Sequence, residues 1–233
     1  MVKMIDVDTY GKFSVLTLKR EKALNAMNLE LMGELIKKLE EQSKKVAVVI
    51  TGSGKSFIAG ADIREMKNFA PREAEEFSVL GNRIMDLLED SDFVSIAAVN
   101  GYALGGGFEV VHACNLAIAG RSAIFAQPEI DLGICPGWGG IKRLERSLGY
   151  KKALELIVTG RRISADEALS MGLINRISDD PVEEAKTLAR EIAAKPPYAI
   201  RYIKELLKRD DRSVKLFSMC FGEEEQKKLM SRF

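Results

Sequence analysis

The sequence predicts an α/β fold with mostly parallel strands, followed by a helical C-terminal region. Two apolar runs, 46–51 and 94–99, are continuous rather than alternating, which is typical of strands buried on both faces. Helical amphipathic patterns follow such runs after short connections, and the order strand-strand-helix repeats. That order favours an α/β core with parallel strand pairing. From Pro181 onward the patterns are essentially helical, with a break at 195–197.

The individual elements are expected in the following order. Strands are expected at 13–18, 46–51, within 57–63, and at 94–99, 116–119, 123–125 and 174–177. Helices are expected at 28–41, 71–89, 107–113, 137–148, 151–159 and 164–172, and in the region after 181. Asn28 is an expected N-cap, and Ser164 with Glu167 has the spacing of a capping box.

Composition excludes several classes of function. The net charge is +1, so no basic excess draws the chain to nucleic acid or acidic membranes. Cys114, Cys135 and Cys220 are scattered without a CxxC pair, which is typical of a protein of the reducing cytoplasm. A single histidine, His112, argues against a zinc site or a Ser-His-Asp triad, and we expect it to pack in its helix. No metal is expected.

Two glycine motifs resemble nucleotide-binding sequences but lack the required spacing. The run VVITGSGKS ends like a phosphate-binding loop at Gly54–Ser56, but the first glycine of that motif would fall at Val49. The triple glycine Gly105–Gly107 lacks the G-x-G-x-x-G spacing of a dinucleotide site. We therefore interpret the first as a turn after a strand. Three consecutive glycines in the second favour close approach of a ligand to the backbone.

The segment 100–130 carries the candidate chemistry. The triple glycine leads from a strand into a helix with Glu109 in its first turn, and Glu129 follows twenty positions later. Each acid alone is more often structural, but together beside a glycine turn they form a plausible acid/base pair. The small residues 59–62 could offer a backbone N–H at Ala61. Trp138 either lines a pocket or covers the core, and Cys114 is expected to fill the core.

These motifs resemble the enoyl-CoA hydratase/isomerase (crotonase) family along nearly the whole chain. The matching blocks are 22–27 (KALNAM), 57–63 (FIAGADI), 98–109 (AVNGYALGGGFE), 125–130 (FAQPEI), 133–140 (GICPGWGG) and 159–168 (TGRRISADEA). The resemblance implies a crotonase-like spiral of repeated ββα units over 1–195. It also implies a helical C-terminal trimerisation region at 196–233, shortened here, so that a homotrimer or dimer of trimers is expected.

The resemblance also implies a chemistry. Ala61 and Gly106 match the two backbone N–H groups of the family's oxyanion hole, and Glu109 and Glu129 match its two acidic positions. The substrate would be an acyl-CoA thioester, with no separate cofactor. By the same resemblance, the residues expected to bind substrate and CoA are Lys22, Ala23, Leu24, Ala59, Ala61, Asp62, Ile63, Arg64, Gly105, Gly106, Pro136 and Gly137. Gly137 could also position Glu129 or a water through its N–H.

Because both acids are present, the resemblance favours an enoyl-CoA hydratase, which converts a trans-2-enoyl-CoA and water to a 3-hydroxyacyl-CoA. Family isomerases can work with one carboxylate at the Glu129 position, so Δ3-Δ2 isomerisation is the nearest alternative. A non-catalytic RNA-binding member is the alternative from another class. The net charge and the intact acids argue against it.

Overall fold

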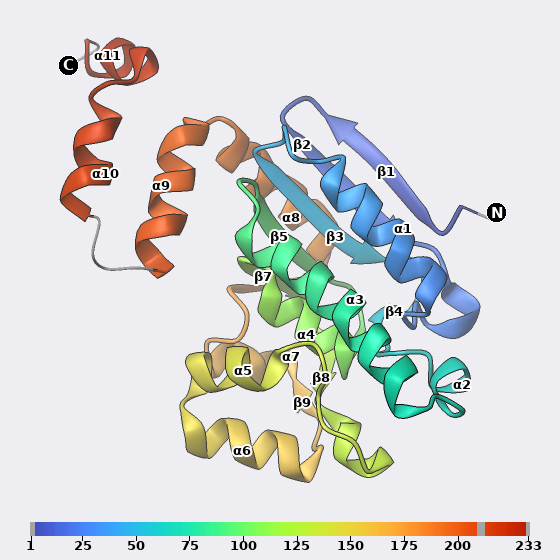
Figure 1. Cartoon of the computed structure of the whole chain (residues 1–233). Coiled ribbons are helices and arrows are strands. Elements are labelled where there is room, and N and C mark those ends of the chain that lie inside the picture. The colour runs from blue at the N-terminus through green and yellow to red at the C-terminus, as the bar shows by residue number, and fades with distance from the viewer. Residues whose placement is uncertain (1–2, 209–212, 232–233) are drawn as a thin grey trace.

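The computed structural model describes residues 3–208 and 213–231, so parts of the expected trimerisation region 196–233 lie outside the described residues. The chain forms two sheets (Figure 1). The strands of the six-stranded sheet are, in spatial order, β1 Ile5–Tyr10, β2 Phe13–Leu18, β3 Ala47–Gly52, β5 Val94–Val99, β7 Leu116–Gly120 and β10 Arg176–Ser178. Those of the four-stranded sheet are β4 Ser56–Ile58, β6 Tyr102–Leu104, β8 Ile124–Ala126 and β9 Ile163–Ser164.

Each repeat contributes one strand to each sheet. The strands β3, β5 and β7 pair in parallel in the large sheet, and β4, β6 and β8 pair in parallel in the small sheet. Only the edge strands β1 and β9 are antiparallel to their neighbours among the paired strands described. The expected order of strand, strand and helix with parallel pairing is therefore confirmed. This arrangement places the ends of β4, β6 and β8 together.

The described helices are as follows. Before β5 they are η1 Glu21–Ala23, α1 Leu29–Glu40, α2 Ile63–Met66 and α3 Pro71–Asp90. After β6 they are α4 Gly106–Ala113, η2 Pro128–Leu132, α5 Gly140–Leu148, α6 Tyr150–Thr159, α7 Ala165–Ser170, α8 Pro181–Ala193, α9 Pro197–Lys208, α10 Ser213–Cys220 and α11 Glu224–Met230. Both expected N-caps are confirmed, since Asn28 and Ser164 each accept a hydrogen bond from the N–H three residues on. The Glu167 carboxylate pairs with Arg161 at 2.8 Å instead of completing the capping box.

The large sheet is buried on both faces. Val49, Ile96 and Ile118 point to the face covered by α8, while Ile50 and Val99 point to the face covered by α1, α3 and α4. In Figure 1, α8 lies behind this sheet and α1 and α3 lie in front of it. The continuous apolar runs that predicted buried strands are thus explained by apolar partners on each side.

The structure differs from the sequence expectations in several elements. Strand β1 was not anticipated because it is an edge strand whose later residues face solvent. The short strand β6 lies in what was expected to be part of a glycine turn. Helix α5 begins at Gly140 rather than at Gly137, because the preceding backbone N–H groups bind a side chain and Gly139 has φ +82°. Strand β10 begins at Arg176 rather than Ile174. Just before it, the N–H of Asn175 donates to the Ala117 carbonyl, and the Asn175 side-chain oxygen accepts from the N–H of Ala117.

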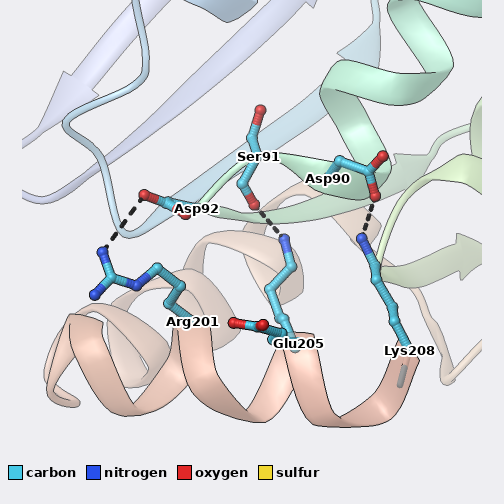
Figure 2. Close-up of a pocket in the computed structure, with 7 residues that line it drawn as sticks. Asp90, Ser91, Asp92, Arg201, Glu205 and Lys208 are labelled. Atoms are coloured by element: carbon cyan, nitrogen blue, oxygen red, sulfur yellow. Dashed lines mark hydrogen bonds and ion pairs between the residues drawn. The ribbon is translucent and has the colours of Figure 1, made fainter. Parts of the chain in front are cut away.

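Helices α9 to α11 extend to one side of the sheets (Figure 1). A surface pocket of about 360 Å³ lies where α9 meets the C-terminal end of α3, and it includes neither Glu109 nor Glu129. Figure 2 shows Lys208 of α9 reaching toward Asp90 at this pocket. The Nζ of Lys204 donates to the carbonyls of Ser91 and Phe93, at 2.6 Å each, and Lys208 pairs with Asp90. Burial lowers the pKa of Lys204 to about 8, so the group is still charged at neutral pH.

Substitution of Lys204 tests this attachment. Lys204→Met leaves two carbonyls without their donor, which costs about 1–3 kcal/mol. We expect amide hydrogen exchange within α9 to become roughly tenfold faster, or more. Arg201→Met is the matched control, because Arg201 is half-exposed and lies 4.0 Å from Asp92. Equal exchange in the two variants would contradict this role of Lys204.

Candidate active site

The triple glycine is required by three different contacts. Gly105 has φ +52°, and a Cβ there would lie 2.8 Å from Oε1 of Glu129. A Cβ on Gly106 would lie 2.1 Å from the Trp138 ring, and one on Gly107 would lie 2.0 Å from the Ile58 carbonyl oxygen. All three distances are too short for a side chain. The close approaches are therefore to other parts of the protein, and they bring four segments together at the start of α4.

Glu109 is held inside this cluster by backbone donors. Its side chain is on the first turn of α4 and the residue is 2% exposed. Its Oε1 accepts hydrogen bonds from the N–H groups of Trp138 and Gly140, both at 2.8 Å. Burial raises the pKa of Glu109, while these two donors and the Arg143 guanidinium act in the opposite direction. The carboxylate thus has fixed stabilisation in an apolar environment.

Glu129, in η2, has fewer compensating donors. The Gln127 amide donates to its Oε1 at 3.1 Å, and its buried Oε2 has no donor among the residues described. Burial raises the pKa of Glu129 to about 7, and the charge of Glu109 adds to the increase. The two glutamates are therefore close enough to interact electrostatically, and they differ in the donors that compensate their negative charge. That difference suits one group to accept a proton and the other to donate one.

Two backbone donors are available beside the glutamates. Neither the N–H of Ala61 nor that of Gly106 has an acceptor within residues 3–208 and 213–231. A Cβ on Gly60 would lie 3.1 Å from the Leu104 carbonyl oxygen, and Gly107 contacts Ile58, so the chain after β4 runs along the start of α4. Gly106 is buried and Ala61 is partly buried. An unpaired N–H group that is shielded from water is costly unless it binds a ligand. They are suited to bind an oxyanion.

The expected CoA segments lie together. The N–H of Ala59 donates to the carbonyl of Leu24, and Met27 forms a parallel bridge with Ala61. This arrangement gathers η1 with Lys22, Ala23 and Leu24 against the segment from Ala59 to Arg64. Lys22, Leu24, Ile63 and Arg64 are exposed. These residues therefore form one surface segment next to the proposed oxyanion site.

Asp62 in this segment has a structural use. Its carboxylate pairs with Arg20 at 2.9 Å and accepts from the N–H of Arg64, capping α2. Burial would raise the pKa of Asp62, but Arg20 and the backbone donors outweigh this effect and hold the pKa below its ordinary value. The carboxylate is engaged by the protein, so a contact of Asp62 with a ligand would use its backbone.

The loop 136–140 is fixed from both sides. Ser78 and Asn82 of α3 donate to the Gly137 carbonyl at 2.7 and 2.9 Å, and Pro136 beside it is buried. The N–H of Gly137, expected to act on Glu129 or water, has no acceptor within the described part of the chain. The loop therefore presents its N–H groups to the site and its carbonyl to α3.

Sequence reasoning missed four contributors. Trp138 and Gly140 bind Glu109 through their backbone, Gln127 binds Glu129, and Arg143 binds the Trp138 carbonyl at 3.0 Å. The side chain of Trp138 is buried on Gly81 and Gly106, so it covers the core rather than lining an open pocket. Backbone donation leaves no residue-type signal. Gln127, between Phe125 and Glu129, could have been singled out as a polar residue in an apolar run.

The other polar candidates have structural roles. His112 packs against Phe108 with ring centroids 4.1 Å apart, and burial lowers its pKa to about 3. Cys114 is buried, as expected, and burial raises the pKa of its thiol to about 12. No cluster of three or more potential metal ligands occurs within residues 3–208 and 213–231. No helix in the same residues is both long enough and apolar enough to span a bilayer.

Comparison with known proteins shows the family of the chain. Residues 8–230 match the family described as enoyl-CoA hydratase/isomerase. The chain is 42% identical to the short-chain-enoyl-CoA hydratase of Clostridium acetobutylicum, across 96% of this chain and 91% of that protein. It is 40% identical to the crotonyl-CoA hydratase of Syntrophomonas wolfei, across 95% of this chain and 91% of that protein.

A solved structure shows the same fold. The crystal structure of enoyl-CoA hydratase from Thermoplasma volcanium superposes with a TM-score of 0.93 at 31% identity, covering 99% of this chain and 97% of that one. The expected crotonase-like spiral of ββα units is therefore confirmed. The chain belongs to the enoyl-CoA hydratase/isomerase family.

The raised pKa of Glu129 predicts a pH-dependent stability. Between its ordinary value of 4.5 and about 7, the folded state binds more protons at this group than the unfolded state does. Stability should therefore fall as pH rises through this window, by about 1–2 kcal/mol after discounting for solvent exposure. We expect Glu129→Gln to remove this part of the dependence in urea unfolding at pH 5 and 7.5. An identical pH dependence in both proteins would contradict the shift.

Proposed function

We propose that this protein hydrates a trans-2-enoyl-CoA reversibly to a 3-hydroxyacyl-CoA. The observation that carries the proposal is the pair of buried Glu109 and partly buried Glu129, near two N–H groups without acceptors among the described residues. Family membership and similarity to named hydratases support it. The reaction is a lyase reaction, and we propose that it needs no metal or separate cofactor, because coenzyme A arrives as part of the substrate.

The proposed mechanism assigns one task to each group. Glu109, held by two backbone N–H groups, accepts a proton from water as the water oxygen bonds to Cβ of the substrate. The π electrons of the C=C bond move toward the thioester, and negative charge develops on its oxygen. The N–H groups of Ala61 and Gly106 stabilise that charge, each contributing on the order of 3 kcal/mol.

Glu129 completes the addition. With its pKa near 7, it carries a proton in a substantial fraction of molecules at neutral pH. It transfers that proton to Cα as the electrons return from the thioester oxygen. The product then has hydroxyl at Cβ and hydrogen at Cα. Proton exchange restores the two carboxyl groups, and the same steps in reverse dehydrate a 3-hydroxyacyl-CoA.

We propose that CoA lies along the surface segment next to the oxyanion site. The exposed residues Lys22, Leu24, Ile63 and Arg64 border this path, and Lys22 could meet a CoA phosphate. The base of this path would be the backbone of Ala23, Ala59 and Asp62, where η1 and the residues after it are hydrogen-bonded to the chain after β4. Gly105, which lies against Glu129, would border the acyl end together with Pro136 and Gly137.

Substitution of each glutamate tests the mechanism. Glu129→Gln and Glu109→Gln should each lower kcat for crotonyl-CoA hydration by roughly 10²- to 10⁴-fold, because proton transfer is lost. Glu183→Gln is the control, since Glu183 lies on α8 on the far face of the large sheet. Turnover by Glu129→Gln at the rate of the control would rule out the assigned role.

Δ3-Δ2 isomerisation is the rival on the same fold, because it can use one carboxylate. A 3-enoyl-CoA and a 2-enoyl-CoA offered to the same preparation separate the two reactions. RNA binding is the remaining alternative. It would be supported by a tight gel shift at physiological salt together with no turnover of either thioester. A panel of 2-enoyl-CoA chain lengths would define the acyl specificity.

We also propose that the protein assembles as a trimer or a dimer of trimers through its C-terminal helices, in the cytoplasm. Supporting this, Leu207 and Val214 are each 84% exposed and Phe217 is 66% exposed. Large apolar side chains so exposed on neighbouring helices are typical of an interface. The cytoplasmic location rests on the scattered cysteines and on the bacterial relatives.

Light scattering tests the assembly. We expect a mass three or six times that of the chain, because the apolar surface of α9 and α10 would be buried between copies. Phe217→Asp should reduce the mass by placing a charge in that surface, and Glu224→Gln on α11 should leave it unchanged. A monomeric wild-type protein at micromolar concentration would refute the proposal.

A further inference from the structure

The loop whose N–H groups bind Glu109 is itself bound by an arginine, Arg143. Glu109 is bound by the N–H groups of Trp138 and Gly140, in a loop that has no regular structure before α5. Such a loop needs an anchor if its N–H groups are to stay directed at the carboxylate. The carbonyl of Trp138, in the same residue as one donor, accepts from Nη1 of Arg143 at 3.0 Å.

Arg143 lies tightly against this loop. Its side chain is 11% exposed. A Cβ on Gly139 would lie 2.5 Å from its Nη1, so the guanidinium lies directly against the backbone of this glycine. The Nε of Arg143 donates to Glu89 at 2.7 Å, and Glu89 lies near the C-terminal end of α3. The arginine therefore connects a long helix to the loop that binds Glu109.

Arg143 also affects the pKa values of the two glutamates near it, Glu89 and Glu109. Glu89 is mostly buried, and although burial would raise its pKa, Arg146 and Arg143 together hold that pKa below the ordinary value. The charge of Arg143 also opposes the increase that burial causes in the pKa of Glu109. The other charged groups that act on this region are Glu129 and Asp86, and Asp86 lies 3.8 Å from Arg143.

We propose that Arg143 is a positioning residue for Glu109: it fixes the Trp138 carbonyl so that the N–H groups of Trp138 and Gly140 stay directed at the carboxylate. Arg143 does not reach the substrate in this role. Glu89 orients Arg143, since it accepts from Nε and leaves Nη1 for the loop. The effect on turnover rests on the proposed hydration, whereas the effect on the loop does not.

The chain offers a matched control. Arg146, one turn further along α5, pairs with the other oxygen of Glu89 at 2.7 Å, but it is 65% exposed, and the donor to the Trp138 carbonyl is Arg143. Arg143→Gln and Arg146→Gln each remove one cation from the same carboxylate. Only the first removes the donor to the Trp138 carbonyl.

The kinetic test separates positioning from folding. For Arg143→Gln we expect kcat for crotonyl-CoA to fall roughly 10- to 100-fold with KM little changed, because a charge-assisted hydrogen bond is lost. The acid limb of the pH–rate profile should move to higher pH, since a cation that favours ionised Glu109 is gone. Arg143→Lys should keep the acid limb near its wild-type position, and its kcat should lie between those of Arg143→Gln and wild type. Arg146→Gln should match wild type within about twofold.

A second readout does not depend on activity. Trp138 is the only tryptophan in the sequence, so its fluorescence reports on this loop alone. We expect acrylamide to quench Trp138 more strongly in Arg143→Gln than in Arg146→Gln. If Arg143→Gln does not fold, Arg143→Lys against Arg146→Lys replaces it in both tests. Equal quenching and equal kcat in the pair would overturn the proposal. Absence of hydration by wild type would overturn only the proposed function, and quenching would still decide the positioning role.

Discussion

The site depends on close packing at the first turn of α4. Four segments meet there: η2 with Glu129, the loop with Trp138, the end of β4, and α4 itself. Each of the other three segments meets a different one of three consecutive glycines at the start of α4, and a Cβ at any of these glycines would lie within 2.8 Å of an atom of its neighbour. The triplet is therefore more than a turn. It sets how near the second carboxylate and the loop donors can come to the helix that carries Glu109.

Placing two acids in that space has a free-energy cost, and the two carboxyl groups are compensated by different numbers of hydrogen-bond donors. Glu109 receives two backbone donors and the field of Arg143, while Glu129 receives an amide from Gln127 and retains a buried oxygen without a donor among the described residues. Burial raises the pKa of both carboxyl groups, and more hydrogen-bond donors and a nearby cation oppose that increase at Glu109. Because the two interact, their proton affinities belong to the pair. A proton acceptor and a proton donor result from the same apolar environment.

Much of this could be predicted from the sequence. Continuous apolar runs identified β3 and β5 because both faces of those strands are buried, and the glycine triplet with two acids identified the site. The edge strand β1 was not predicted, because several of its residues are polar and its later residues face solvent. The donors to Glu109 could not be seen, because a backbone N–H of Trp138 or Gly140 carries no signature of residue type. The three glycines were expected to allow close approach of a ligand to the backbone, and the structure shows in addition that each allows close approach of another part of the protein.

The central claim is that Glu109 and Glu129 share one apolar site and that Glu129 is shifted by both burial and its partner's charge. Carbon-13 NMR titration of the glutamate side chains, with Glu129→Gln to assign the resonance, measures this directly. The account predicts a midpoint near 7 for Glu129 in the folded protein, and a lower midpoint in Glu109→Gln. A midpoint near 4.5, unchanged by Glu109→Gln, would contradict it.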